Sequence, residues 1–545
     1  KLTKKQFLDR LFKTFPLTED DETEINITLK LFEQLNELDN QNINGIWARI
    51  IKNAFAPLFV EKFDLVVGNP PWVNWESLPE DYRQNTKSLW EYYGLFPHGG
   101  MDTILGKGKK DISMLMTYVA MEEYLQEGGK LGFVITQSVL KTSGAGEGFR
   151  RFKLGDGTPI SVIHVDDMSM MKPFEGASNR TAVMILEKGK PTKYPVPYTI
   201  WRKTAYGIGL KDDDTIQQIQ EKTSRSRFVA EPVNNNEIYS SWLSGKRNAL
   251  KAIKKILGSS DYKAHAGAYS GGANAVYWLE KLKDLPDGSV MVTNITKGAK
   301  RKVDDIHAAI EPRFVYPLLR SGDLQRWLAK PKCYILFVQD PQKRKGIDEE
   351  YLNKHYPKTY DYLKYFQEDL ANRKDRGTRG VIDSGGAFYS IFGVGDYTIK
   401  NFKVVWGRMG SSTASAVVGL VNGKPVIPQE TVSLIGCDSE DEAHYICALI
   451  NSSPYDYTLQ SYSQRGGKSF GTPGVLENAR IPAFEVNNSV HLELAKLSKN
   501  AHEAVSSDRC VQEIEEKIDR EAAKVWDLAD EELRGIQQSL SELQG

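Results

Sequence analysis

The residues best suited to chemistry are Asn69-Pro70-Pro71-Trp72, which follow a short apolar run from Phe63 to Gly68. An amine on an aromatic ring is a poor nucleophile, because its lone pair is delocalised into the ring. The side-chain oxygen of Asn69 and the backbone carbonyl of Pro70 could both accept hydrogen bonds from such an amine. These bonds would draw the nitrogen toward tetrahedral geometry and free the lone pair for in-line attack on a methyl sulfonium.

The residues after Asn69 favour the same chemistry. Consecutive prolines fix φ and cannot donate, so Pro70 and Pro71 would present carbonyls in a set geometry. Trp72 offers a ring face on which a base flipped out of a duplex could stack. The alternative is a plain turn at the end of a strand, because Asn and Pro favour turns. The apolar strand before the loop and the aromatic residue after it favour a functional loop.

The elements that would position this loop follow from the apolar pattern. Helices are predicted within residues 5–58, and a helix over 111–126 is expected to stop at Gly128-Gly129. Short apolar runs predict strands at 63–67, 131–136, 161–165 and 181–187. Strands that alternate with helices are typical of a doubly wound α/β sheet, which binds ligands at the carboxyl ends of its strands.

The pattern changes near residue 205, where short aromatic strands such as 334–338, 402–406 and 432–435 alternate with glycine-rich turns. We therefore predict a Rossmann-like α/β domain over 46–204 and a mixed α+β domain over 205–480. They are flanked by a helical segment at 1–45 and a helical, acidic tail at 481–545. The charge differs between these parts. Residues 241–480 hold 34 Lys and Arg against 25 Asp and Glu, whereas residues 481–545 hold 7 against 14. A basic middle suits a polyanionic partner, although an unevenly charged surface is the alternative.

The composition excludes several classes. With 40% hydrophobic and 26% charged residues the chain resembles an ordinary globular protein. No apolar stretch is long enough to cross a membrane, so a cytoplasmic protein is expected. The cysteines are scattered with no CxxC pair, which argues against a zinc site or a disulfide framework; they are Cys333, Cys437, Cys447 and Cys510. No metal is expected.

The order of these motifs resembles the γ-class adenine-N6 DNA methyltransferases. Residues 63–72 look like motif IV of that family, and Asp111-Ile-Ser-Met-Leu115 like its next motif. Residues 128–138 resemble its "PGG-strand-NS" motif, with the proline and the asparagine replaced. Residues 171–174, followed by 179–188, resemble the closing motif, in which a second aromatic residue packs against the target base. Phe174 would be that residue here; a phenylalanine of the core is the alternative.

The resemblance extends to the type IIG restriction–modification enzymes and related phage-defence methylases. Residues 313–327, 357–363, 370–373 and 449–452 are similar to their target-recognition domains, and 518–535 to their helical ending. The resemblance implies a partial Rossmann-like methyltransferase sheet from motif IV onward, a target-recognition domain and a helical tail. It implies S-adenosylmethionine as cofactor, with Asn69 and Asp111 beside it.

One part of the family pattern is missing. No Gly-x-Gly loop that could cradle the cofactor precedes Asp64, and the glycine-rich loop at 143–148 comes after motif IV rather than before it. We therefore expect an upstream segment or a separate subunit to complete the cofactor site, and we expect this chain alone to be inactive.

Basic residues of the middle domain suit contacts with DNA phosphates, although each alone suits a solvated surface equally well. The candidates are Lys297, Lys300, Arg301, Lys302, Arg373, Arg376, Arg379, Arg465 and Lys468. The predicted function is site-specific methylation of adenine N6 in double-stranded DNA, in a restriction–modification or phage-defence system. The alternatives are a non-catalytic DNA-binding specificity subunit and a protein-glutamine N5-methyltransferase. The long basic middle region argues against the second of these.

Overall fold

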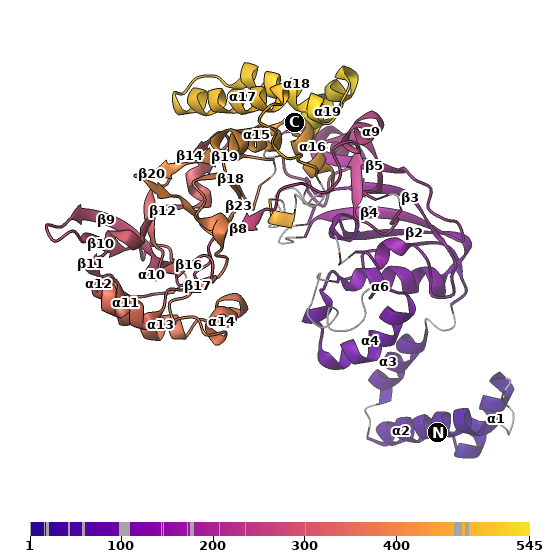
Figure 1. Ribbon diagram of the computed structural model, residues 1–545. Coiled ribbons are helices and arrows are strands. Elements are labelled where there is room, and N and C mark those ends of the chain that lie inside the picture. Colours follow the sequence, from indigo (N-terminus) through magenta and orange to yellow (C-terminus); the bar gives the residue numbers. More distant parts are fainter. Residues whose placement is uncertain are drawn as a thin grey trace.

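The computed structural model describes residues 2–15, 17, 21–41, 44–56, 60–96, 110–142, 144, 146–171, 173–174, 179–205, 208–234, 236–299, 301–410, 412–462, 471–474 and 479–544. A first lobe with a large sheet and a second lobe with smaller sheets lie side by side, and C-terminal helices lie across both (Figure 1). Among the described helices, none is long and apolar enough to cross a bilayer.

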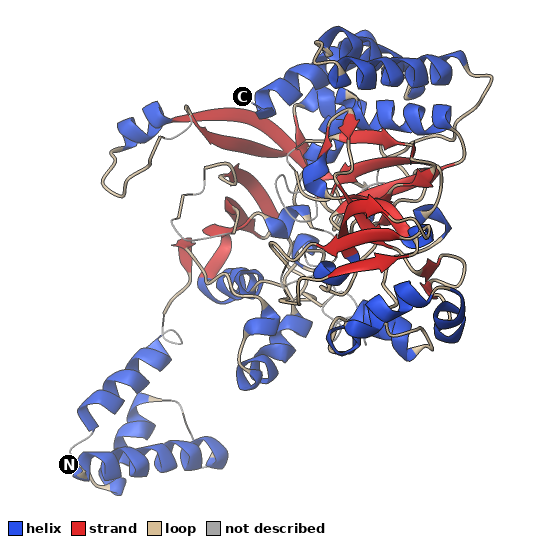
Figure 2. Cartoon of the chain, turned by 90° about the vertical axis from the view of Figure 1, so that its left-hand side faces the viewer, coloured by secondary structure: helices blue, strands red, loops and turns tan. Residues whose placement is uncertain are grey.

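The N-terminal helices form where the sequence predicts them, as α1 (Lys4–Thr14), α2 (Glu22–Asn40) and α3 (Asn44–Phe55). Thr3 caps α1 by accepting a hydrogen bond from the backbone N–H of Gln6. The ring of Phe7 stacks on that of Phe32 with the centroids 4.3 Å apart, so α1 and α2 pair with each other. They extend away from both lobes in Figures 1 and 2.

The first lobe is built on a seven-stranded sheet that contains all four predicted strands and confirms the α/β class. In spatial order its strands are β1 (Phe63–Gly68), β2 (Leu125–Thr136), β4 (Thr181–Lys188), β3 (Ile160–Asp167), β5 (Val196–Lys203), β6 (Thr223–Pro232) and β7 (Trp242–Gly245). The pairs β1/β2 and β3/β5 are parallel and the others antiparallel, so the sheet is mixed. The sheet does not end near residue 204, where the sequence pattern changes, because β6 pairs with every residue of β5.

The first lobe also contains helices. They are α4 (Glu80–Tyr92), α6 (Ile112–Val119) with a π-helical turn at Ala120–Tyr124, α7 (Ser138–Lys141) and α9 (Arg247–Ile253). The predicted stop at Gly128-Gly129 is wrong, because the helix already ends at Tyr124 and both glycines lie in β2. Gly128 has φ +76°, a conformation that suits glycine.

The second lobe has its own core between a six-stranded sheet and a group of helices. The sheet consists of β11 (His307–Ile310), β10 (Val290–Asn294), β9 (Trp278–Asp284), β15 (Cys333–Leu336), β12 (Val315–Leu319) and β22 (Ile427–Pro428). The helices are α11 (Glu349–His355), α12 (Pro357–Tyr365), α13 (Gln367–Ala371) and α14 (Arg376–Asp383). A four-stranded sheet follows, ordered β19 (Ser415–Val418), β18 (Phe402–Gly407), β23 (Val432–Cys437) and β8 (His265–Ala266). The strands predicted at 334–338, 402–406 and 432–435 are therefore present.

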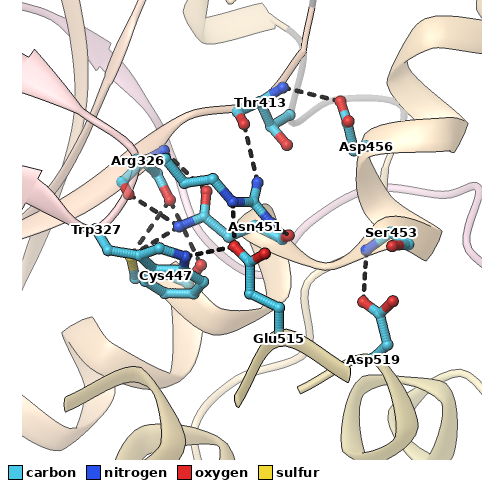
Figure 3. A network of polar contacts seen from close by, with 10 residues as sticks. Arg326, Trp327, Thr413, Cys447, Asn451, Ser453, Asp456, Glu515 and Asp519 are labelled. Carbon is cyan, nitrogen blue, oxygen red and sulfur yellow. Dashed lines mark hydrogen bonds and ion pairs between the residues drawn. The ribbon is translucent and has the colours of Figure 1, made fainter. Parts of the chain in front are cut away.

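The C-terminal region is helical, as predicted, and it joins the lobes. Its helices are α15 (Glu440–Asn451), α16 (Ser453–Tyr462), α17 (Ser489–Ser506), α18 (Gln512–Val525) and α19 (Asp530–Gln544). One continuous core runs from the seven-stranded sheet into these helices and onto β18 and β23. Ion pairs of 2.8 Å, Lys246–Glu542 and Lys255–Glu532, hold α19 to the first lobe. Polar contacts of Arg326 and Trp327 with Glu515 hold α18 to the second (Figure 3).

Candidate functional site

The Asn69–Trp72 loop leaves the carboxyl end of β1 beside β2. The two strands are parallel, with Gly68 opposite Phe133. A Cβ atom on Gly68 would lie 3.1 Å from the Phe133 ring, so glycine lets the strand ends approach closely. Pro70 is buried, whereas the Asn69 side chain is exposed and makes no hydrogen bond within the described residues. Its amide is therefore available to a ligand.

Trp72 and Phe174 are in contact. Their ring centroids are 5.4 Å apart and the ring planes meet at 75°, an edge-to-face arrangement. The indole Nε1 of Trp72 donates to the carbonyl of Val134 in β2 over 3.2 Å, which fixes the orientation of the ring. Phe174 remains 40% exposed, so it lies at the protein surface and not in the core. The tertiary structure thus places both predicted aromatic residues beside the loop of Asn69.

The segment before α6 ties down the far end of this loop. The backbone N–H of Trp75 donates to Lys110 over 2.7 Å, and that of Ile112 donates to Val73 over 2.9 Å. The carboxyl group of Asp111 caps α6 by accepting from the N–H of Ser113 over 2.9 Å. Asp111 is only 6% exposed, and burial raises its pKa.

Asp111 has a structural role in this geometry. One carboxyl oxygen is used in the cap and the other faces the hydroxyl of Thr136 at 3.4 Å. Asp111 thereby positions α6 and the far end of the Asn69–Trp72 loop. Its expected place beside a cofactor stays a prediction.

An aromatic cluster that the sequence analysis did not predict packs against Trp75, shortly after the Asn69–Trp72 loop. Trp75 lies edge-to-face on Trp90 and Phe96, with centroid distances of 5.2 and 5.3 Å. The ammonium of Lys110 lies 5.4 Å from the centroid of the Phe96 ring, and burial lowers its pKa. The density of aromatic residues between 72 and 96 was the available signal, but their mutual packing depends on the turn before α4.

The basic residues predicted to meet DNA form one neighbourhood in the second lobe. Arg301 donates to the carbonyls of Asp369 and Asn372 at 3.1 and 3.3 Å, which brings residues 297–302 next to the start of α14. The exposed members are Lys297, Lys302, Arg376 and Arg379. The structure therefore unites two patches that are distant in sequence. Lys300, Arg465 and Lys468 lie outside the described residues.

Arg373 is a correction. Its side chain is 1% exposed, and the guanidinium donates to four backbone carbonyls, those of Leu370, Ser270, Ser390 and Phe388. A guanidinium enclosed in this way cannot reach a phosphate. Arg373 holds the segment before α14 to the core of the second lobe, and the expectation that it binds DNA is wrong.

Among the described residues, no group of three or more His, Cys, Asp or Glu side chains could hold a metal ion. The four cysteines are free, and only Cys510 is exposed.

Comparison with known proteins shows which proteins the chain is similar to. Residues 2–170 match the Eco57I restriction-modification methylase family. The match includes the N-terminal helices, which the predicted catalytic boundary at residue 46 had left out. The type II methyltransferase M.NspV from Nostoc sp. is 28% identical over 406 residues, covering 71% of this chain and 69% of that protein. M.MjaIV, a type II methyltransferase from Methanocaldococcus jannaschii, is 21% identical over 252 residues, covering 44% and 78%. The chain is thus similar to restriction–modification methylases, as the motifs predicted.

Two solved restriction–modification enzymes align with this chain at low TM-scores. The type IIL enzyme MmeI in complex with DNA superposes with a TM-score of 0.49 at 11% identity and 88% coverage of this chain. The type IIG endonuclease BpuSI gives a TM-score of 0.28 at 13% identity and 86% coverage. The chain spans 57% and 55% of the length of these two enzymes.

Proposed function

We propose that this protein methylates N6 of adenine in double-stranded DNA, as part of a restriction–modification or phage-defence system. The observation that carries the proposal is the contact between Trp72 and Phe174 beside the amide of Asn69, which has no hydrogen-bond partner in the described part of the chain. Two aromatic rings next to a hydrogen-bond acceptor suit a flipped base with an exocyclic amine. The similarity to type II methyltransferases supports the reaction class.

In this proposal the chain promotes methyl transfer by holding the adenine base and its amine in a fixed position. The Asn69 side-chain oxygen and the carbonyl of Pro70 accept hydrogen bonds from the adenine amine, which restores nucleophilic character to its lone pair. Trp72 and Phe174 enclose the base and exclude water from it. Such preorganised acceptors act mostly in the transition state, where the amine gains positive charge.

S-adenosylmethionine is the proposed methyl donor, and when bound it would supply an electrophilic methyl sulfonium. The described residues fit only part of its site, because Asn69 is accessible but the Asp111 carboxyl group is committed to the helix cap. We propose that an upstream segment or a separate subunit completes the site.

The free edge of the sheet supports this completion. β1 is the terminal strand of the sheet, and only β2 pairs with it among the described strands. Its side chains Phe63, Leu65 and Val67 are 47%, 69% and 84% exposed. An apolar edge strand of this kind is an open pairing surface. Phe63, Leu65 and Val67 alternate along the strand and therefore share one face of the sheet. A polypeptide that adds a strand to β1 and also packs on that face would cover these side chains and lie next to Asn69.

The second lobe is proposed as the target-recognition domain. The exposed Lys297, Lys302, Arg376 and Arg379 would contact phosphates, which supplies affinity without base specificity.

Substitution of Asn69 tests the proposal. Tritium transfer from labelled S-adenosylmethionine to phage DNA, catalysed by the complete protein, should fall by about 10²- to 10³-fold in Asn69→Ala. DNA affinity should change little, and the matched variant Asn74→Ala should stay near the wild type. Near-wild-type transfer by Asn69→Ala would contradict the proposal. Specific DNA binding without any transfer by the wild type would instead favour a specificity subunit.

A further inference from the structure

A buried carboxylate lies at the end of β3, where the segment that leads to Phe174 begins. Asp167 is 3% exposed, and its Oδ2 accepts hydrogen bonds from Gln137 Nε2 at 2.6 Å and from the Tyr198 hydroxyl at 2.5 Å. Its Oδ1 accepts from the backbone N–H of Ser169 at 2.9 Å. A buried carboxylate needs such donors, because its desolvation is otherwise unfavourable.

The bond to Ser169 fixes the start of the segment that carries Phe174. The N–H of Met168 donates to the carbonyl of Thr181 at 3.0 Å, and that of Met171 donates to Met168 at 2.9 Å. Met171 is buried, at 4% exposure. Residues 167–171 therefore form an anchored turn, from which the chain leaves toward Phe174.

Gln137 connects this turn to the rest of the site. Its backbone N–H donates to the carbonyl of Arg180 at 2.7 Å, so Gln137 holds the return of the segment as well as its start. It directly follows β2, whose Val134 carbonyl holds the indole of Trp72. The end of β2 therefore contacts both Trp72, through Val134, and the segment that carries Phe174, through Gln137. Within the described residues, the buried Oε1 of Gln137 has no hydrogen-bond partner, although buried polar atoms usually have one.

We propose that Asp167, held by Gln137 and Tyr198, is a positioning residue that sets Phe174 against Trp72 and thereby the width of the base site. This inference rests on the proposed function. Burial and the charge of Asp167 raise the pKa of Tyr198 well above its usual value, so the hydroxyl keeps its proton and donates.

The experiment measures base flipping and turnover in the complete protein. 2-Aminopurine replaces the adenine that the wild type methylates, a position found by sequencing DNA from cells that express the protein. Asp167→Ala should lower both the fluorescence rise and kcat by between about tenfold and a hundredfold, because a small displacement of Phe174 misplaces the base. The DNA dissociation constant should stay within about twofold, since the duplex contacts lie elsewhere.

The matched control is Asp166→Ala, the neighbouring carboxylate, which bonds to Trp201 rather than to the turn. It should leave flipping and kcat unchanged. Tyr198→Phe removes one donor with little change of volume and serves if Asp167→Ala does not fold; it should act in the same direction.

A double-mutant cycle separates positioning from a general structural role. If Asp167 acts through Phe174, then Asp167→Ala combined with Phe174→Ala should be no slower than Phe174→Ala alone. Losses that multiply, or unchanged flipping in both Asp167→Ala and Tyr198→Phe, would overturn the inference. A wild type that transfers no methyl group would instead refute the proposed function.

Discussion

Glu515 in α18 accepts a hydrogen bond from Arg326 of the second lobe, with 2.5 Å between Oε1 and Nε. The same oxygen accepts from the indole of Trp327 at 2.7 Å (Figure 3). Arg326 also donates to the carbonyls of Thr413 and Asn451 at 3.1 and 2.5 Å. One carboxylate therefore fastens the C-terminal helices to the second lobe.

Glu515→Ala should destabilise the protein, because the buried Trp327 indole and the half-buried Arg326 lose their acceptor. We expect a loss of about 2 kcal/mol in the free energy of unfolding, measured by urea denaturation. Glu515→Gln retains an acceptor and should lose less. The exposed Glu513 on the same helix provides the control Glu513→Ala; equal losses at both positions would contradict the role of Glu515.

Trp72→Ala should weaken base flipping. Stacking of an aromatic residue on a base contributes about 1–3 kcal/mol, so 2-aminopurine at the target position should brighten less than with the wild type. Trp201→Ala, which removes an indole from β5, is the control. An unchanged signal in Trp72→Ala would exclude Trp72 as the stacking face.

Val67→Asp should abolish methyl transfer while this chain remains folded. Val67 is 84% exposed on the free edge strand, so a charge there does not disturb the described core but opposes the addition of a polypeptide. Thermal unfolding of the chain and transfer by the complete protein are the two measurements. Val486→Asp, at a residue 69% exposed before α17, controls for added charge. Full transfer by Val67→Asp would show that the completing segment binds elsewhere.

The double variant Arg376→Ala, Arg379→Ala should bind DNA less tightly and with a weaker salt dependence. Each lost phosphate contact lowers the slope of log K against log salt by about 1, so we expect a decrease of about 2. Lys496→Ala on α17 should not change the slope. Arg373→Ala should reduce stability and leave the slope unchanged; a lower slope there would restore Arg373 to the DNA surface.

Mild acid should destabilise the C-terminal region. Burial, with the neighbouring His502, lowers the pKa of His444 from 6.5 to about 3. The unfolded chain therefore binds a proton below pH 6.5 that the folded chain excludes until about pH 3. Stability is complete above that window and falls through it, by up to about 1.4 kcal/mol for each pH unit. In urea denaturation at pH 7 and pH 5, His444→Gln should lose less stability than the wild type, whereas the exposed-site variant His307→Gln should match the wild type.

The strands, and the loop that follows β1, were predictable from the sequence. Apolar runs such as 63–67 and 181–187 have strand character that depends on neighbouring residues, and the order Asn69-Pro70-Pro71-Trp72 defines its own turn and its acceptors. The helical ending was equally predictable, because its apolar spacing is local.

Partner choice between distant segments was decided only by the tertiary structure. Trp72 meets Phe174 because β2 and β4 pair side by side. Asp167 gains its donors because Gln137, which follows β2, and Tyr198 of β5 both come within reach of the end of β3. Arg373 resembles its neighbours Arg376 and Arg379 in sequence, but its burial depends on carbonyls from Ser270 and Ser390. The sheet continues past residue 204 because β6 forms antiparallel hydrogen bonds with β5. A local pattern specifies what a segment can form, whereas burial and pairing depend on which distant backbone groups come into reach.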